Sequence, residues 1–395
     1  MLTERSHRGQ KGKENEEAQE DEDAEDVGDG VRVFLYTSHR WGLEEWDYRS
    51  PSSPGIGGSE TAQVEVTWRL ARRGHDVVSY APIPDGCKTD WRKTGWYHSR
   101  YAEPTLDGLW ILSRCPEVMD KFGPRRKEQP RWLVCQDTHY DGFKDRGMNK
   151  ERASKLDVVF ALCPQHVDYL KRRYSYLADK VVLSGNGIKS GEIHDLLSTR
   201  QPERNPHRLI WTSSPDRGLA TMLRIFKRAR EFVPTLELHC FYGWDNIEKF
   251  DDSDGGFWAK ARAECESLLD QPGVTWHGRV GQSQLYLEYL KSSLWAYPTA
   301  FSETSCISAM EAQALGCIPI SVPFWGIAHN VLAGTLIEGF AATDPLTRAR
   351  YVGEIVRYAT DEKLQATVRT QMTAAALERF DWEHVVDQYE GLLNA

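Results

Sequence analysis

The chain has 395 residues, of which 40% are hydrophobic and 11% aromatic, values that suit a globular protein with room for two domains. No apolar run approaches the ~20 residues of a membrane-spanning helix, and the polar, acidic N-terminus does not resemble a signal peptide. The eight cysteines form no CxxC pair, which argues against a zinc site and indicates reduced, buried thiols in a cytoplasmic protein.

The formal net charge of −9 is unevenly distributed along the chain. Residues 1–30 carry 11 acidic and 4 basic side chains and almost no apolar ones, so we expect a disordered acidic tail. Residues 31–200 carry 27 basic and 22 acidic side chains. The part of the chain that follows the tail is therefore the basic part.

The first folded segment begins with a compact apolar run at Val31–Thr37, which predicts a buried strand. After a polar insert, the sequence GIGGSE (Gly55–Glu60) precedes a helical pattern that Gly74 closes, and Asp76–Ala81 predicts the next strand. Glycines at a helix entrance allow a phosphate or sugar to approach the backbone closely. Further apolar runs predict parallel strands at residues 109–112, 132–135, 158–163 and 181–183. We therefore assign a first domain to residues 31–197.

A polar, proline-bearing stretch at residues 198–207 predicts a linker, after which the pattern begins again. Strands are predicted at residues 209–213, 237–242, 274–277, 294–297 and 318–322. Two such series of alternating strands and helices imply α/β architecture with two doubly wound, Rossmann-like domains and a ligand cleft between them. The second domain is assigned to residues 208–376, and a last helix to residues 377–395.

The glycine motif does not fit a dinucleotide dehydrogenase. That fingerprint needs a third glycine where Glu60 stands, and an acidic residue at the end of the second strand, where the chain has Ser79 and Tyr80.

The most informative stretch is AFSETSCISAMEAQALGCIP, residues 300–319. Glu303 precedes an apolar-periodic run and Glu311 lies within it, which predicts a loop that leads into a helix. Free N–H groups near Thr304, Ser305 and Cys306 would form an anion site. Position 311 is eight residues after position 303. If about six of these residues are helical, the carboxylates of Glu303 and Glu311 lie roughly 9 Å apart along the helix axis, at ~1.5 Å per residue. A bound diphosphate would then have a sugar near Glu303 and a ribose near Glu311. The alternative is a glutamate favoured by the helix dipole and a second one in solvent.

Five motifs in this order resemble the GT-B glycosyltransferases of the large retaining group called family 4. The motifs are the glycine loop and helix at residues 57–77, SGNGI at 184–188, SSPDRGL at 213–219, the E-x7-E pair, and FDWEHVVDQY at 380–389. The resemblance extends from Val31 to the C-terminus. It implies a GT-B fold, in which two Rossmann-like domains face each other across a cleft and a C-terminal helix crosses back to the first.

The resemblance also implies roles for single residues. Glu303 would hold hydroxyls of the donor sugar, Glu311 the ribose, and the backbone N–H groups of Thr304 and Ser305 the diphosphate. Gly57 and Gly58 would approach the diphosphate from the first domain. Arg217 stands at the family's cation for the departing phosphate, where a fixed positive charge favours the transition state.

Two positions depart from the family pattern. Thr212 stands where many relatives carry an additional arginine, so Arg279 becomes the candidate for a second cation, with a surface loop residue as the alternative. The strand that ends in CQDTHYDGF leaves either Asp137 or His139 near the sugar, where relatives often have a histidine. A lone histidine in a polar loop is otherwise simply exposed.

The implied activity is hexosyl transfer from a UDP- or GDP-sugar, with retention and without a bound cofactor or metal. The alternatives are a sugar-nucleotide epimerase or phosphorylase of the same fold, or a protein that only binds sugar. The acceptor is expected on the first domain, where bases are frequent between residues 120 and 155. Modified DNA, a phosphate-linked lipid or an acidic polysaccharide would fit such a surface, and an ordinary mixed-charge surface is the alternative. Aromatic side chains that could stack on the acceptor are Trp91, Trp96, Tyr97 and Tyr101.

Overall fold

The computed structural model describes residues 30–38, 45–53, 55–84, 89–140, 147–200, 203–244 and 256–394. The predicted acidic tail lies outside these ranges except for Gly30. Within them, no helix combines the length and apolar character needed to cross a membrane. Each cysteine in the described ranges is buried and forms no disulfide.

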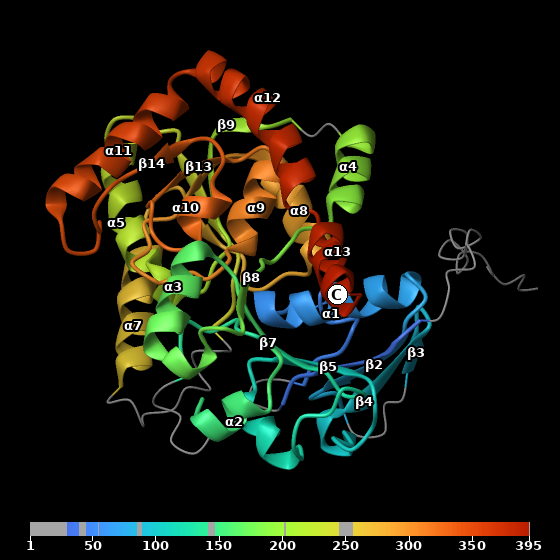
Figure 1. The fold of residues 1–395 in the computed structure, drawn as a ribbon. Coiled ribbons are helices and arrows are strands. Elements are labelled where there is room, and N and C mark those ends of the chain that lie inside the picture. The colour runs from blue at the N-terminus through green and yellow to red at the C-terminus, as the bar shows by residue number, and fades with distance from the viewer. Residues whose placement is uncertain are drawn as a thin grey trace, which may run out of the picture.

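The first domain is built on an eight-stranded sheet in the order β3-β4-β2-β1-β5-β6-β7-β8 (Figure 1). Its strands are β1 (Arg32–Tyr36), β2 (Asp76–Ala81), β3 (Thr89–Trp91), β4 (Thr94–His98), β5 (Leu109–Ser113), β6 (Arg131–Val134), β7 (Val158–Ala161) and β8 (Val181–Leu183). The pairing is parallel except for the β3–β4 hairpin. Because helices cover both faces of such a sheet, its central strands are apolar throughout, as in β5, where every residue is buried.

The second domain has a parallel, six-stranded sheet in the order β11-β10-β9-β12-β13-β14. Its strands are β9 (Asn205–Trp211), β10 (Glu237–Cys240), β11 (Val274–Trp276), β12 (Ser292–Ala296), β13 (Ile318–Ser321) and β14 (Thr335–Leu336). The order reverses beside β9, which places a topological switch point, the usual ligand position of an α/β sheet, at the carboxyl ends of β9 and β12.

Helices connect the strands of both sheets. Those of the first domain are α1 (Gly58–Arg72), α2 (Lys150–Ser154) and α3 (Pro164–Arg173). Those that pack on the second sheet are α4 (Ser190–Thr199), α5 (Leu219–Arg230), α7 (Phe257–Leu269), α8 (Gln282–Lys291), α9 (Ile307–Ala314), α10 (Ile327–Asn330), α11 (Pro345–Ala359) and α12 (Glu362–Arg379), and the last helix is α13 (Trp382–Leu393). Short 3-10 turns lie at Ser99–Tyr101, Pro116–Lys121, Ser175–Leu177 and Pro215–Arg217.

The first domain was predicted to end at residue 197, which assigns most of α4 to it, whereas the packing of α4 places it with the second domain. Ile193 is fully buried in the core of the second sheet, and Ser190 Oγ donates to the carbonyl of Leu377 in α12 at 2.8 Å. The predicted linker at residues 198–207 is also shorter than expected. The helix runs through Thr199 and β9 begins at Asn205, because Asn205 pairs in register with Ser292 of β12.

The chain crosses between the domains twice, and the two crossings lie side by side. The N–H of Ile188 donates to the carbonyl of Phe380 at 2.7 Å, and the N–H of Trp382 donates to the carbonyl of Ile188 at 3.3 Å. The crossing helix was predicted at residues 377–395, but residues 377–379 complete α12. α13 starts at Trp382 because the carboxylate of Asp381 accepts the N–H of Glu383 at 2.9 Å.

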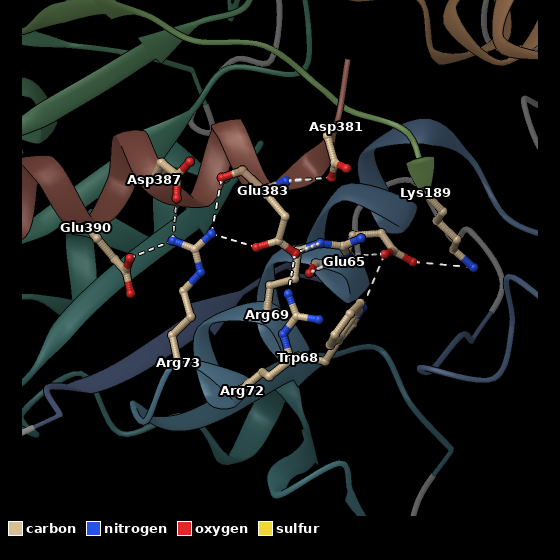
Figure 2. A network of polar contacts seen from close by, with 10 residues as sticks. All are labelled: Glu65, Trp68, Arg69, Arg72, Arg73, Lys189, Asp381, Glu383, Asp387 and Glu390. Carbon is tan, nitrogen blue, oxygen red and sulfur yellow. Dashed lines mark hydrogen bonds and ion pairs between the residues drawn. The ribbon is translucent and has the colours of Figure 1, made fainter. Parts of the chain in front are cut away.

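Helix α13 is attached to the first domain by apolar and ionic contacts. Tyr389 stacks on Phe160 of β7 with ring centroids 4.6 Å apart. Arg73, which follows α1, contacts three carboxylates of α13, as Figure 2 shows. The partners are Glu383, Asp387 and Glu390, each at 2.6 Å. The end of the chain therefore belongs, by its packing, to the first domain.

Candidate active site

A cavity of about 230 Å³ lies between the two domains. The first domain contributes the loop before α1, and the second contributes the turn before α5 and the start of α9. The lining residues used below are Gly55, Gly57, Gly58, Thr212, Arg217, Tyr242, Gln282, Glu303, Ser305, Ile307 and Glu311. Segments that are far apart in sequence thus share one cavity.

The first-domain wall is the glycine loop that the sequence singled out. Gly57 is the N-cap of α1, and a Cβ atom on Gly58 would lie 3.3 Å from Cδ1 of Ile307, the first residue of α9. Two helix N-termini, those of α1 and α9, therefore meet at the cavity, and both favour negative charge. Gly55 has φ +96°, and a Cβ there would lie 2.5 Å from the carbonyl oxygen of Val280. Any other residue at position 55 would disturb the contact between the domains.

The loop before α9 carries some of the predicted donors. Ser305 lines the cavity, and its Oγ accepts the N–H of Asn186 from the first domain at 3.1 Å. Thr304 is not among the lining residues, and its hydroxyl donates to the carbonyl of Gln136 at 3.1 Å. The N–H of Cys306 already donates to Asn330 Oδ1 at 2.8 Å, so this end of the helix offers one donor fewer than the sequence predicts.

Glu303 and Arg217 form an ion pair that lines the cavity. Arg217 Nη1 lies 3.7 Å from Glu303 Oε1, and its Nε lies 3.1 Å from Asp216 Oδ2. Burial by itself would lower the pKa of Arg217, but Glu303 and Asp216 outweigh it and raise that pKa. The hydroxyl of Tyr297 donates to Glu303 Oε1 at 2.6 Å. Tyr297 fixes this carboxylate, and none of the sequence motifs pointed to it.

Glu311 lies inside α9 and is buried. Its Oε1 accepts from Gln282 Nε2 at 2.7 Å and from the hydroxyl of Tyr286 at 3.1 Å. Burial raises the pKa of Glu311 to about 7 in spite of these two hydrogen bonds. A ligand that donates further hydrogen bonds would favour the charged form of this carboxylate. The hydroxyls of a ribose are donors of that kind.

The two positions considered for a second cation differ in their relation to the cavity. Thr212 lines the cavity, and its hydroxyl bonds that of Tyr289 at 2.6 Å. Arg279 is not a lining residue, but its Nη1 donates to the carbonyl of Gly55 at 3.3 Å and its guanidinium lies 5.1 Å from the ring centroid of Tyr242. Its charge is therefore held at the edge of the cavity, against the glycine loop.

Asp137 and His139 do not line this cavity. His139 is exposed, whereas Asp137 forms an ion pair with Arg114 at 2.8 Å. Arg114 directly follows β5, and sequence reasoning missed it. A basic residue at the carboxyl end of a predicted parallel strand could have been a signal, because ligands bind at such ends.

The surface predicted for an acceptor differs from the expectation in two respects. Trp96 is fully buried and cannot stack on a ligand, and Trp91 already stacks on Tyr48 at 4.7 Å. Several bases between residues 120 and 155 are also neutralised by carboxylates. The ion pairs are Arg125–Asp157, Arg126–Asp107, Arg152–Asp120 and Lys155–Glu151. The positions of Lys144 and Arg146 lie outside the described residues.

The chain was compared with protein families, known sequences and solved structures. No protein-family model matches the chain. It is 24% identical over 182 residues to a lipopolysaccharide 1,2-N-acetylglucosaminetransferase of Salmonella typhimurium, a match that spans 45% of each protein and thus less than half of that relative.

Two solved structures resemble nearly the whole chain. The first is the UDP-forming alpha,alpha-trehalose-phosphate synthase of Burkholderia vietnamiensis, with a TM-score of 0.66, 12% identity, and coverage of 93% of this chain and 97% of that one. The second is the sucrose-phosphate synthase of Thermosynechococcus elongatus, with a TM-score of 0.64, 15% identity, and coverage of 92% and 98%. The chain has the GT-B glycosyltransferase fold. The predicted fold class is confirmed, while membership of family 4 stays a prediction.

The GT-B fold explains why the candidate residues meet. Parallel strands in both sheets end at the cleft, so the loops that follow β9 and β12 carry Arg217 and Glu303 to the same cavity. Both loops belong to the second domain, and α1 closes the cavity from the first. The arrangement offers an anion site flanked by two carboxylates.

Proposed function

We propose that this GT-B protein transfers a hexosyl group from a nucleotide sugar to a hydroxyl group. The observation that carries the proposal is the meeting of the α1 and α9 N-termini and Arg217 with Glu303 and Glu311 around one cavity. The helix ends and Arg217 suit a diphosphate. Glu303 suits the hydroxyls of the sugar, and Glu311 those of the ribose.

A uridine nucleotide is the donor that we favour. The trehalose-phosphate synthase that resembles this chain is described as UDP-forming, and a GDP-sugar is the alternative. In the proposed pose the base continues past Glu311 toward Gln282 and Val280, which line the same cavity.

The proposed chemistry depends on charge that develops on the leaving phosphate. As the glycosidic bond breaks, Arg217 and the two helix ends meet a growing negative charge, so they bind the transition state more strongly than the ground state. The leaving phosphate would take the proton of the acceptor hydroxyl on the same face of the sugar, which gives retention of configuration. This route requires no separate general base and no metal ion, because protein groups neutralise the diphosphate.

A neutral glycan hydroxyl is the acceptor that we propose. The relative from Salmonella typhimurium acts, by its name, on lipopolysaccharide, which supports a glycan. The bases that suggested a nucleic acid, an anionic lipid or an acidic polysaccharide are partly neutralised by ion pairs. Those anionic acceptors are therefore not favoured.

The proposal can be tested with the full chain. UDP, GDP and ADP are titrated by calorimetry, and UDP-glucose, UDP-N-acetylglucosamine and GDP-mannose are incubated with the protein and analysed by mass spectrometry. We expect UDP to bind and one donor to be cleaved slowly to nucleoside diphosphate and free sugar. Glu303→Gln should lower this hydrolysis about a hundredfold, since a charge-assisted hydrogen bond is lost. Glu264→Gln, in an exposed ion pair with Arg224, should leave it unchanged.

Other products would point elsewhere. An epimerised nucleotide sugar would replace the transferase by an epimerase, and cleavage that requires inorganic phosphate would indicate a phosphorylase. Nucleotide binding without turnover of any donor would favour a binding protein. If none of the three nucleotides binds, the site assignment itself is wrong.

A further inference from the structure

Arg114, which follows β5, connects the loop after β6 with the first turn of α1 at the edge of the cleft. Its Nη2 and Nε donate to the two carboxylate oxygens of Asp137 at 2.8 and 3.2 Å. Its Nη1 donates to Ser59 Oγ at 3.0 Å and to Glu60 Oε1 at 3.2 Å. The contact to Asp137 is bidentate, which fixes the carboxylate in orientation as well as in position. Ser59 and Glu60 belong to the first turn of α1, directly after the glycine loop.

The backbone of Arg114 is in an unfavourable conformation. Its φ is +65°, in the left-handed region that a non-glycine residue seldom adopts and that costs of the order of 1 kcal/mol or more. The side-chain contacts hold the residue there. Such conformations gather at functional sites, where surrounding contacts enforce them.

Asp137, the main partner of Arg114, is held near Glu303 by its neighbours in the chain, although its side chain does not line the cavity itself. Both of its neighbours in sequence contact the loop that carries Glu303. The hydroxyl of Thr138 donates to the carbonyl of Ser302 at 3.2 Å, and the carbonyl of Gln136 accepts from the hydroxyl of Thr304 at 3.1 Å. These two bonds bracket Asp137 on one side of the cleft and Glu303 on the other. A sugar bound at Glu303 would therefore have the Asp137 loop as its other wall.

The two carboxylates that flank Arg114 explain why a cation is needed between them. Glu60 and Asp137 are two carboxylates beside a cavity that we assign to a diphosphate, and without a cation they would repel it. The guanidinium of Arg114 lies between them. Burial opposes the charge of Arg114, but Asp137 and Glu60 raise its pKa, so the guanidinium stays protonated. One group thus keeps two acidic side chains compatible with an anionic donor.

We propose that Arg114 is a positioning residue that holds Asp137 so that this carboxylate accepts a hydrogen bond from a hydroxyl of the donor sugar. The inference rests on the proposed glycosyl transfer and deepens it. In this proposal Asp137 of the first domain and Glu303 of the second domain each form hydrogen bonds with hydroxyls of the sugar. Arg114 does not touch the sugar, and its contribution is the orientation of Asp137.

The test compares Asp137→Asn, Arg114→Lys and the wild type on the donor that the wild type cleaves and on its deoxy analogues, each of which lacks one sugar hydroxyl. We expect the wild type to discriminate against one analogue by about tenfold to a hundredfold in kcat/KM, the effect of one charge-assisted hydrogen bond. Asp137→Asn should remove most of this discrimination, and Arg114→Lys should reduce it, because lysine cannot form the bidentate contact. UDP affinity should change less than about threefold, since neither residue lines the nucleotide cavity.

Further variants separate positioning from stability. Arg114→Met alone would leave the carboxylate of Asp137 without its cation. The double variant Arg114→Met, Asp137→Asn removes both charges and avoids this. We expect this double variant to discriminate no less than Asp137→Asn alone. Arg126→Met, which breaks an exposed pair with Asp107 in the same domain, is the control and should keep the full discrimination.

The outcomes distinguish this inference from the proposed function. If the wild type cleaves a donor and both single variants keep its preference among the analogues, Arg114 has only a structural role and the inference is wrong. Equal loss of rate on every analogue, with unchanged preference, would overturn the inference in the same way. If the wild type neither binds UDP nor cleaves a donor, the proposed function fails and the inference fails with it.

Discussion

At the scale of single residues, the buried carboxylate of Glu311 makes stability and ligand binding depend on pH in opposite ways. Burial raises its pKa from 4.5 to about 7 in the folded protein. Between these two values the folded state holds more protons than the unfolded state, so the free energy of unfolding falls as pH rises through this window. Above pH 7 the full penalty, on the order of 3 kcal/mol, is present.

Glu311→Gln should remove this penalty. The amide oxygen can still accept from Gln282 and Tyr286, so we expect the variant to be more stable than the wild type at pH 8 and nearly equal to it at pH 5. UDP binding should weaken about tenfold at pH 8, because the ribose loses a charged acceptor. Thermal unfolding at both pH values and calorimetry with UDP measure the two effects. A stability difference that is independent of pH would contradict the titration of Glu311 near neutrality.

Arg217 is expected to matter more for turnover than for binding. The charge on the leaving phosphate grows toward the transition state, so Arg217→Ala should lower kcat for donor hydrolysis by about a hundredfold or more and change UDP affinity by less than about tenfold. Arg217→Lys should recover part of the rate. Arg224→Ala, an exposed arginine of α5, is the control. Equal losses in affinity and rate would indicate plain anchoring of the phosphate.

The sequence indicates Glu303 and Glu311 by their places before and within a predicted helix, and Arg217 by the family resemblance. The residues that orient them could not be found in this way. Tyr297 directly follows β12 as an ordinary aromatic residue, and its bond to Glu303 depends on a turn that no periodicity encodes. For Arg114 the only signal in the sequence is its place directly after a predicted strand, because its partners Glu60 and Asp137 are brought together only by the tertiary fold.

At the scale of elements, α13 depends on cations of the first domain. Its acidic residues at positions 383, 387 and 390 are three or four positions apart on one face and would repel each other without cations. Arg73 contacts all three of them, while Arg69 and Arg72 contact only Glu383. Arg73→Ala should therefore lower the free energy of unfolding by about 1–3 kcal/mol. Urea unfolding measures this, and Arg357→Ala, which breaks an exposed pair within α11, should cost less. A loss no larger than that of Arg357→Ala would mean that apolar contacts alone hold α13.

Strands and helices with strong periodicity were predictable, and short or paired elements were not. The hairpin of β3 and β4 was missed because its strands, TDW and TGWYH, are too short to show alternation. The assignment of α4 failed for another reason. A helix between two domains has an apolar face whether it packs on the first domain or on the second. Only the tertiary fold decides that Ile193 enters the core of the second sheet.

At the scale of the whole molecule, two doubly wound domains followed from two series of alternating strands and helices, and the GT-B arrangement followed from the family resemblance, but the contacts across the cleft followed from neither. Thr138 and Ser302 are 164 residues apart in sequence, and nothing local marks them as neighbours. The same holds for charge. A count of bases in the first domain predicts an anionic acceptor, whereas the fold pairs several of those bases with carboxylates of the same domain.

This pairing leads to a prediction about salt. A surface that neutralises six to ten phosphates loses about a thousandfold or more in affinity for DNA between roughly 50 and 200 mM salt. Here we expect weak binding to duplex DNA and to anionic vesicles that changes less than about threefold over that range, because bases in local ion pairs release few counterions. Asp107→Asn removes the carboxylate partner of the half-exposed Arg126, so it should increase both the binding and its salt dependence. A steep fall in binding by the wild type would contradict the neutral acceptor and restore an anionic one.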